Sequence, residues 1–240
     1  MSKRVIITGG SSGIGFGMAK RFLKEGASVV LNARDARKLE VAAAELGHAD
    51  RVAVLAGAIG DPETGKQLAA LAKQRFGGAD VLVNNAGIFG VKPFLESSSE
   101  ELDAFLGTNL KGTYLVTQAV TPLLIEAGGG AIINIGTVLV SQGMTNLPVS
   151  AAMASKGGVH ALTVSWAAEL AKHNIRVNTL APGIIRTPLI GDNADDFAAA
   201  HPLGRIGEVE DTADAAWFLA NAPYVTANVL NVDGGYAHGR

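Results

Sequence analysis

A glycine-rich turn near the N-terminus is the strongest chemical signal in the sequence. It follows the apolar run Val5-Ile6-Ile7 and reads Thr-Gly-Gly-Ser-Ser-Gly-Ile-Gly over residues 8–15. Glycines let a backbone approach a pyrophosphate closely, and a helix starting here directs free N–H groups and its positive dipole end at the anion. The pattern predicts dinucleotide binding, and a plain strand-to-helix turn is the alternative. The residues predicted to bind are Gly9, Ser11, Ser12, Gly13, Ile14 and Gly15.

Alternating strand and helix patterns must position this turn. Apolar runs predict strands at Arg4–Thr8, Ser28–Asn32, Arg51–Ala56, Val81–Asn84, Ala131–Ile135, Ile175–Leu180 and Val229–Val232. Helical spacing predicts helices at Ile14–Glu25, Ala36–Leu46, Pro62–Phe76, Glu100–Ala127 (broken near Asn109), Ala151–Lys172 and Asp211–Leu219. Several strands are apolar without alternation, as in parallel strands covered on both faces. The order predicts an α/β fold, a doubly wound, Rossmann-like parallel sheet of about seven strands with helices on both faces.

Length and composition limit the protein's class. The chain has 240 residues, 48% of them apolar, and a formal charge of −2. We expect one domain over residues 1–240, with a substrate lid near residues 188–204; an ordinary surface helix at Asp192–Ala200 is the alternative. No long basic run points to nucleic acid, and no apolar stretch approaches the ~20 residues that cross a membrane. Without a secretory signal the cytoplasm is expected, and without cysteine or another ligand pattern we expect no metal.

Further motifs follow the turn in a fixed order. Asn84-Asn85-Ala86-Gly87 closes the fourth strand, Asn109 lies in Thr-Asn-Leu-Lys-Gly, Pro182-Gly183-Ile184-Ile185-Arg186-Thr187 follows the sixth strand, and Asn-Val-Asp-Gly-Gly closes the last. In these motifs the whole chain resembles the classical short-chain dehydrogenases/reductases. The resemblance implies hydride transfer between a nicotinamide cofactor and a carbonyl or alcohol. It also implies cofactor contacts from Asn85, Ala86, Gly87, Lys156, Pro182, Gly183, Ile185 and Thr187.

The same resemblance implies four groups for proton transfer: an asparagine, a hydroxyl residue after the fifth strand, a tyrosine, and a lysine four residues after the tyrosine. Asn109, Thr137 and Lys156 match three of them. Ala152 stands where the tyrosine is usual, and alanine can neither donate nor accept a proton. Because a positioned acid/base group supplies ~10²–10⁴ in rate, we expect impaired reductase activity unless another group substitutes.

Three substitutes for the phenol are open. The Ser150 hydroxyl could reach the vacated space, although its weak acidity favours a turn or helix-cap role. His160 shares a helix face with Ala152 and Lys156 and titrates in a useful range, but a structural histidine is the competing interpretation. A water molecule held by the three matching side chains is the substitute we favour. Ala152 is either natural or an engineered replacement.

The end of the second strand bears on the choice of cofactor. An acidic side chain there would bond the ribose hydroxyls of NAD and repel a 2′-phosphate. The family alignment places that position on Ala33, and the next residue is Arg34, whose forked donors suit a phosphate. Asp35 argues the other way, because a shift of one residue would put its carboxylate near the ribose. NADP(H) is therefore expected over NAD(H).

The substrate side is described by composition alone. Residues 138–144 and 188–192, expected above the nicotinamide, are mainly apolar and suggest a small carbonyl or alcohol substrate. The resemblance implies a homo-oligomer, a tetramer or dimer, through the helices Leu110–Ala127 and Ala151–Lys172. The leading hypothesis is an NADP(H)-dependent oxidoreductase with atypical proton transfer. The alternatives are a non-catalytic NADP(H)-binding sensor or assembly subunit, an engineered inactive variant, or a lyase or isomerase on the same scaffold.

Overall fold

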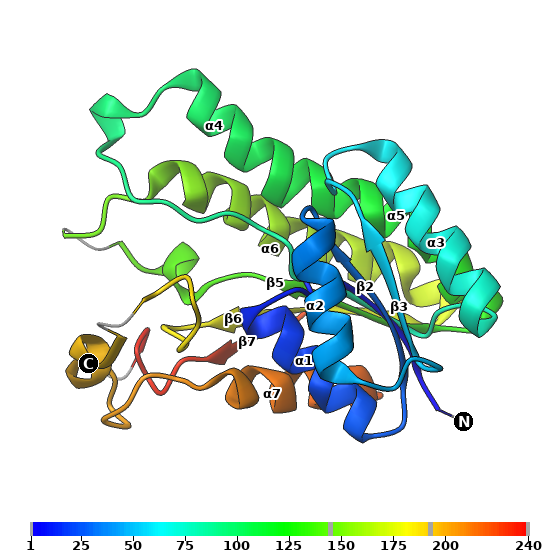
Figure 1. Ribbon diagram of the computed structural model, residues 1–240. Helices are drawn as coiled ribbons and strands as arrows, with labels where there is room; N and C mark the ends of the chain where they lie inside the picture. Colours follow the sequence, from blue (N-terminus) through cyan, green and yellow to red (C-terminus); the bar gives the residue numbers. More distant parts are fainter. Residues whose placement is uncertain (1, 144–145, 192–193, 239–240) are drawn as a thin grey trace.

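The architecture is a parallel sheet between two layers of helices, seen in a computed structural model that describes residues 2–143, 146–191 and 194–238 (Figure 1). The sheet has seven strands in the order β3-β2-β1-β4-β5-β6-β7, and every pairing is parallel. The strands are β1 (Arg4–Thr8), β2 (Ser28–Ala33), β3 (Val52–Ala56), β4 (Val81–Asn84), β5 (Gly130–Ile135), β6 (Ile175–Pro182) and β7 (Val229–Val232). The predicted doubly wound α/β fold is confirmed.

Two apolar cores, one on each face of the sheet, hold the layers together. The first lies beneath α1 (Gly13–Lys24), α2 (Ala36–Leu46) and α7 (Val209–Asn221). The second lies beneath α3 (Pro62–Phe76), α5 (Thr113–Glu126) and α6 (Ser150–Leu170). Burial on both faces explains why the strands read as nearly continuous apolar runs. Among the described residues no helix has the length and apolar character needed to cross a membrane.

Short polar signals determine where several helices begin. Asp35 accepts a hydrogen bond of 3.0 Å from the main-chain N–H of Lys38 at the start of α2. Asp61 caps α3 in the same way, and Ser98 forms a capping box with Glu101 at the start of α4 (Ser99–Phe105). These bonds satisfy N–H groups that have no partner within the helix. The Asp35 carboxylate is therefore engaged in capping.

The predicted break near Asn109 is confirmed as an interruption of the α-helical pattern, but the chain does not leave the helix there. It runs from α4 through a π-helical segment, η2 (Leu106–Gly112), into α5, and Asn109 is buried within that segment. A π-helical turn shifts the register of the helix face and is frequent at functional sites. Several bounds also differ from prediction by one or two residues; the two-residue differences are that β6 runs on to Pro182, α6 ends at Leu170, and α7 spans Val209–Asn221. The remaining short helices are η1 (Phe94–Glu96), η3 (Val138–Ser141), η4 (Ala171–His173) and η5 (Ala194–Ala200).

Candidate active site

The glycine-rich turn lies where the strand order of the sheet reverses. β1 pairs with β2 on one side and with β4 on the other, and ligands of open parallel sheets bind at such a reversal, outside the carboxyl ends of the strands. Gly9 (φ 66°) and Gly13 (φ 53°) have left-handed backbone conformations, which glycine adopts readily. A β-carbon on Gly9 would lie 2.8 Å from Cα of Ala86. The turn therefore needs glycine for its conformation and for its close approach to the end of β4.

Hydrogen bonds join this turn to the segment after β4. The Thr8 hydroxyl accepts bonds from the main-chain N–H groups of Asn85 (3.1 Å) and Ala86 (3.0 Å). The Asn85 amide donates to the main-chain oxygens of Thr8 (3.0 Å) and Gly9 (2.9 Å). Two sets of predicted cofactor residues therefore lie side by side. Thr8 was not among the predicted residues, and its only signal is its place as the last strand residue before the turn.

The N-terminus of α1 is open to an anion. Ser12 occupies the N-cap position without capping the helix, and the first turn carries no acidic residue. Across the described chain, neither the Ser11 nor the Ser12 hydroxyl has a hydrogen-bond partner. Ile14 packs against the core beneath α1, and a β-carbon on Gly15 would meet the main-chain oxygen of Gly9 at 2.4 Å. Free N–H groups, hydroxyls and the helix dipole at one point fit the pyrophosphate of a dinucleotide.

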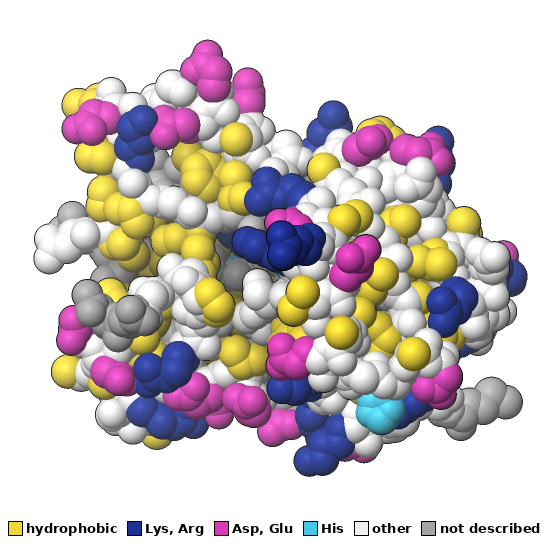
Figure 2. All heavy atoms as spheres, in the orientation of Figure 1, with side chains coloured by type: hydrophobic (Ala, Val, Ile, Leu, Met, Phe, Trp, Pro, Cys, Tyr) yellow, Lys and Arg dark blue, Asp and Glu magenta, His cyan; other side chains and the backbone are white. Residues whose placement is uncertain are grey.

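The end of β2 carries unpaired positive charge. Ala33 ends the strand, and the next residue, Arg34, is exposed. Arg34, Arg37 and Lys38 form no ion pair with any residue that the structure describes. Figure 2 shows Lys and Arg side chains gathered at the edge of a hollow in the surface. The neighbouring Asp35 carboxylate caps α2 and forms no ion pair with Arg34.

Lys156 of α6 reaches across to the end of β5. Its Nζ donates a hydrogen bond of 2.6 Å to the main-chain oxygen of Ile135. Burial lowers the pKa of Lys156 to about 8, because desolvation disfavours the ammonium form. A β-carbon on Gly87 would lie 3.4 Å from this Nζ and 3.1 Å from Oδ1 of Asn109. The structure thus brings Gly87, Asn109 and Lys156 to one place.

Both polar atoms of the Asn109 side chain make hydrogen bonds. Its Oδ1 accepts a bond of 2.8 Å from the N–H of Ile88, and its Nδ2 donates to the Ile88 oxygen (3.0 Å) and to Oγ of Ser155 (2.9 Å). Ser155 donates in turn to the main-chain oxygen of Ala152 at 2.7 Å. Asn109 therefore connects the segment after β4 to the turn of α6 that carries Ala152. Ser155 was not predicted, because a serine one residue before the lysine has no spacing signal of its own.

The first turn of α6 carries Ala152, the residue at the position where a tyrosine is expected. Ala152 is 1% exposed and lies one helical turn before Lys156. The hydroxyl of Thr137, at the end of β5, accepts a bond of 3.3 Å from the N–H of Leu139 and begins η3. The helix-cap role suggested for Ser150 is wrong, because Val149 occupies the N-cap position and no side chain caps this helix.

His160 lies one turn beyond Lys156, against the sheet. Its Nε2 is buried without a hydrogen-bond partner among the described residues, and a β-carbon on Gly136 would lie 2.2 Å from it. Burial and the Lys156 charge lower the pKa of His160, which keeps the ring neutral. A ring packed against β5 favours the structural interpretation over that of an acid/base group.

The segment after β6 closes the other side of the crevice. Pro182 ends β6, Gly183 approaches Asp233 so closely that a β-carbon would lie 2.9 Å from its Cβ, and Ile185 is buried. A β-carbon on Gly13 would lie 3.3 Å from the Thr187 side chain, so this segment reaches the glycine-rich turn. Of the predicted substrate segments and lid, Met144, Asp192 and Asn193 lie outside the described residues, and η5 forms the remainder of the helix suggested at Asp192–Ala200.

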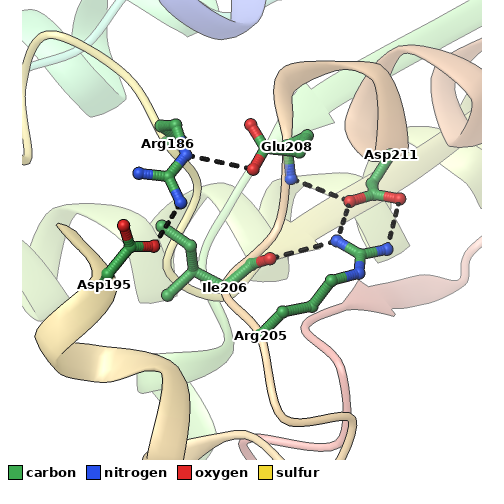
Figure 3. Close-up of polar contacts among 6 residues, drawn as sticks. All are labelled: Arg186, Asp195, Arg205, Ile206, Glu208 and Asp211. Carbon is green, nitrogen blue, oxygen red and sulfur yellow. Dashed lines mark hydrogen bonds and ion pairs between the residues drawn. The ribbon is translucent and has the colours of Figure 1, made fainter.

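Arg186 joins the predicted lid to the start of α7 (Figure 3). It forms an ion pair with Asp195 of η5, and its Nε donates to Glu208 at 3.0 Å. Arg205 binds both carboxylate oxygens of Asp211, at 2.6 and 3.0 Å. The Arg186 guanidinium is thus paired with two carboxylates of its own chain.

Comparison with known proteins assigns this site to a family. A family profile described as enoyl-(acyl carrier protein) reductase matches residues 9–237. A short chain dehydrogenase/reductase family protein of known structure is 37% identical, with a TM-score of 0.90 over 99% of this chain and 100% of that one. The chain belongs to the short-chain dehydrogenase/reductase family. A second solved member, from Mycobacterium marinum, is 34% identical with a TM-score of 0.93 over 98% of this chain and 96% of its own.

Named relatives in the short-chain dehydrogenase/reductase family act on different substrates. A 3-oxoacyl-[acyl-carrier-protein] reductase of Thermotoga maritima is 37% identical over 97% of each chain. A 3alpha-hydroxysteroid dehydrogenase of Mediterraneibacter gnavus is 36% identical over 97% of this chain and 96% of its own. The chain is therefore an oxidoreductase of a family that uses nicotinamide cofactors, and its relatives do not agree on a substrate.

Proposed function

We propose that the protein is an NADP(H)-dependent short-chain dehydrogenase/reductase that acts on a small carbonyl or alcohol, with a water molecule in place of the usual tyrosine hydroxyl. The meeting of Lys156, Asn109 and Gly87 beside the open N-terminus of α1 carries this proposal. It joins a phosphate cradle to a buried amine at the place where the strand order of the sheet reverses.

Different residues of the site would bind different parts of the dinucleotide. The first turn of α1, with Ser11 and Ser12, would hold the pyrophosphate, and Arg34 would pair with the 2′-phosphate. The fork of an arginine suits phosphate oxygens, and an unpaired guanidinium loses no existing ion pair when it binds one. Lys156 would hold the nicotinamide ribose. When bound, the cofactor supplies or accepts the hydride.

Proton transfer is assigned to water held by this chain. The Thr137 hydroxyl would orient and polarise the substrate oxygen, and the Lys156 ammonium would donate a proton through a water beside Ala152. A pKa of about 8 keeps the amine largely protonated at neutral pH while leaving it acidic enough to exchange its proton. Asn109 would position α6 through Ser155 rather than act as an acid.

The proposal is tested by NADPH oxidation with a panel of ketones and aldehydes, using the wild-type chain and Ala152→Tyr. The proposal is supported if either protein oxidises NADPH and if adding the Lys156→Met substitution to that protein abolishes the activity. The alternative is a non-catalytic NADP(H)-binding subunit, favoured by Ala152, and it predicts micromolar or tighter NADPH binding with no turnover by either protein. Failure to bind NADPH would reject both functions.

We also propose a homo-oligomer assembled through the outer faces of α5 and α6. Tyr114, Ile125 and Val164 on these helices are 44%, 39% and 54% exposed, and an interface between copies would bury them. Light scattering should give a dimer or tetramer mass, and Val164→Asp should lower it.

A further inference from the structure

Three segments follow the carboxyl ends of β4, β5 and β6, where the substrate would lie. The structure describes them over residues 88–103, residues 138–143 and 146–149, and residues 186–191 and 194–211. The N–H of Lys92 donates to the oxygen of Pro148 at 2.8 Å, which joins the first to the second. Leu139 and Ile184 pack in one apolar cluster, which brings the second to the strand end that leads into the third. Figure 2 shows a hollow with hydrophobic side chains on one side and Lys and Arg side chains at its opposite edge, while Asp and Glu side chains gather at the upper and lower left of the view.

These segments carry exposed apolar side chains. Val91 is 52% exposed on the first segment, and Leu189 (70%) and Phe197 (45%) are exposed on the third. The segment 138–149 contains no charged residue at all. Apolar walls with few polar groups are typical of sites for small organic ligands.

The outer rims are acidic. Residues 88–103 contain one lysine and four carboxylates, Glu96, Glu100, Glu101 and Asp103, a formal charge of −3. Residues 186–191 and 194–211 contain two arginines and five carboxylates, a formal charge of −3. The chain as a whole carries only −2, so negative charge is concentrated on the substrate side.

The few cations of these rims are neutralised. Lys92 pairs with Glu101 at 2.7 Å, Arg205 with Asp211, and Arg186 with both Asp195 and Glu208 (Figure 3). No described lysine or arginine of either rim is therefore available to bind a phosphate. Arg34, Arg37 and Lys38, at the end of β2, are unpaired. Of these described cations, the ones free to bind phosphate lie on the cofactor side.

We propose that the substrate mouth selects uncharged, apolar carbonyl compounds that arrive free in solution, and discriminates against the same compounds carried on coenzyme A or a phosphopantetheine arm. This inference rests on the proposed function. A carrier-bound substrate that placed its carbonyl at the nicotinamide would leave its phosphates outside the mouth, at the level of the acidic rims. Like-charge repulsion there lowers the association rate and the affinity, and salt relieves it.

The test compares two substrates with the same reacting ketone. Acetoacetyl-coenzyme A carries phosphates, and the N-acetylcysteamine thioester of acetoacetate keeps the thioester without them. We expect kcat/KM for the small thioester to exceed that for the coenzyme A ester by on the order of tenfold at 25 mM salt. The ratio should fall towards one at 300 mM salt because only the coenzyme A ester speeds up.

The second part of the test reverses the charge of carboxylates on the acidic rims. Glu96→Lys and Asp196→Lys should raise kcat/KM for the coenzyme A ester several-fold and leave the small thioester unchanged. Asp50→Lys, the same change on the exposed loop before β3, is the matched control and should alter neither. The inference would be overturned if kcat/KM for the coenzyme A ester equalled that for the small thioester at low salt. It would also be overturned if the ratio of the two kcat/KM values did not change with salt or with the charge-reversing substitutions. Either result would leave the proposed function standing. If neither the wild-type chain nor Ala152→Tyr turned over either thioester or any ketone of the panel, the proposed function and the inference would both be rejected.

Discussion

The Nζ of Lys156 donates a hydrogen bond of 2.6 Å to the main-chain oxygen of Ile135, the last residue of β5. This bond fixes the amine at the carboxyl edge of the sheet, beside Gly87 and Asn109. Burial at that point lowers the pKa of Lys156 from 10.5 to about 8. The consequences are measurable in stability as well as in catalysis.

Lys156→Met should change how stability depends on pH. Below pH 8 both the folded and the unfolded wild-type chain hold the lysine proton. Between pH 8 and 10.5 the lysine is more fully protonated in the unfolded state than in the folded state. The free energy of unfolding of the wild-type chain therefore increases with pH in this range. Urea unfolding at pH 7.5 and pH 10 should show wild type gaining stability relative to Lys156→Met. Parallel pH dependence of the two proteins would mean that the lysine is not desolvated in solution.

Ala152→Tyr should raise kcat for a small ketone by ~10²–10⁴, because a phenol beside the Lys156 charge becomes a positioned acid. Ala152→Phe, which has the same ring without the hydroxyl, is the control and should give no such gain. Both variants must bind NADPH for the comparison to count, since a ring at a buried position can disturb packing. Equal rates for the tyrosine and phenylalanine variants would contradict the position assigned to the missing group.

Arg34→Ala should weaken NADPH binding by on the order of 10- to 100-fold and leave NADH unchanged, because a charge-assisted bond to phosphate is worth ~1.5–3 kcal/mol. Fluorescence titration with both cofactors measures this. Lys24→Ala, which removes an exposed cation at the far end of α1, is the matched control. Loss of NADH and NADPH binding to the same extent would show that Arg34 does not read the 2′-phosphate.

Asp35→Ala tests the assignment of this carboxylate to capping. Losing the bond to the Lys38 N–H should lower the free energy of unfolding by ~0.5–2 kcal/mol. The ratio of NADPH to NADH affinity should stay within a factor of about two. Asp35→Asn, which keeps a capping oxygen, should restore most of the stability. A marked rise in NADPH preference in both variants would instead place the aspartate near the ribose.

The sequence predicted the sheet well because its strands are buried on both faces and read as apolar runs between helical patterns. The glycine-rich turn and the Asn85–Gly87 motif follow strands that meet at one edge, so their proximity was also predictable. The π-helical segment was not, because it depends on bonds from Asn109 to Ile88 and Ser155. Those partners come together only after the layers pack.

The pairing of Arg186 was equally hidden from the sequence. Its two carboxylate partners lie 9 and 22 residues away, so no local pattern links them. His160 illustrates the same limit: helical spacing placed it on the face of Lys156, and only packing against Gly136 separates a structural role from a chemical one.

Hydride transfer itself is the most direct test of the account. The wild-type chain is incubated with NADPH deuterated at the transferred position of the nicotinamide and a neutral apolar ketone, and the product is analysed by mass spectrometry. The account predicts deuterium on the alcohol carbon, at a rate that Ala152→Tyr increases and Lys156→Met abolishes. Deuterium in no product, from either wild type or Ala152→Tyr across the ketone panel, would contradict it.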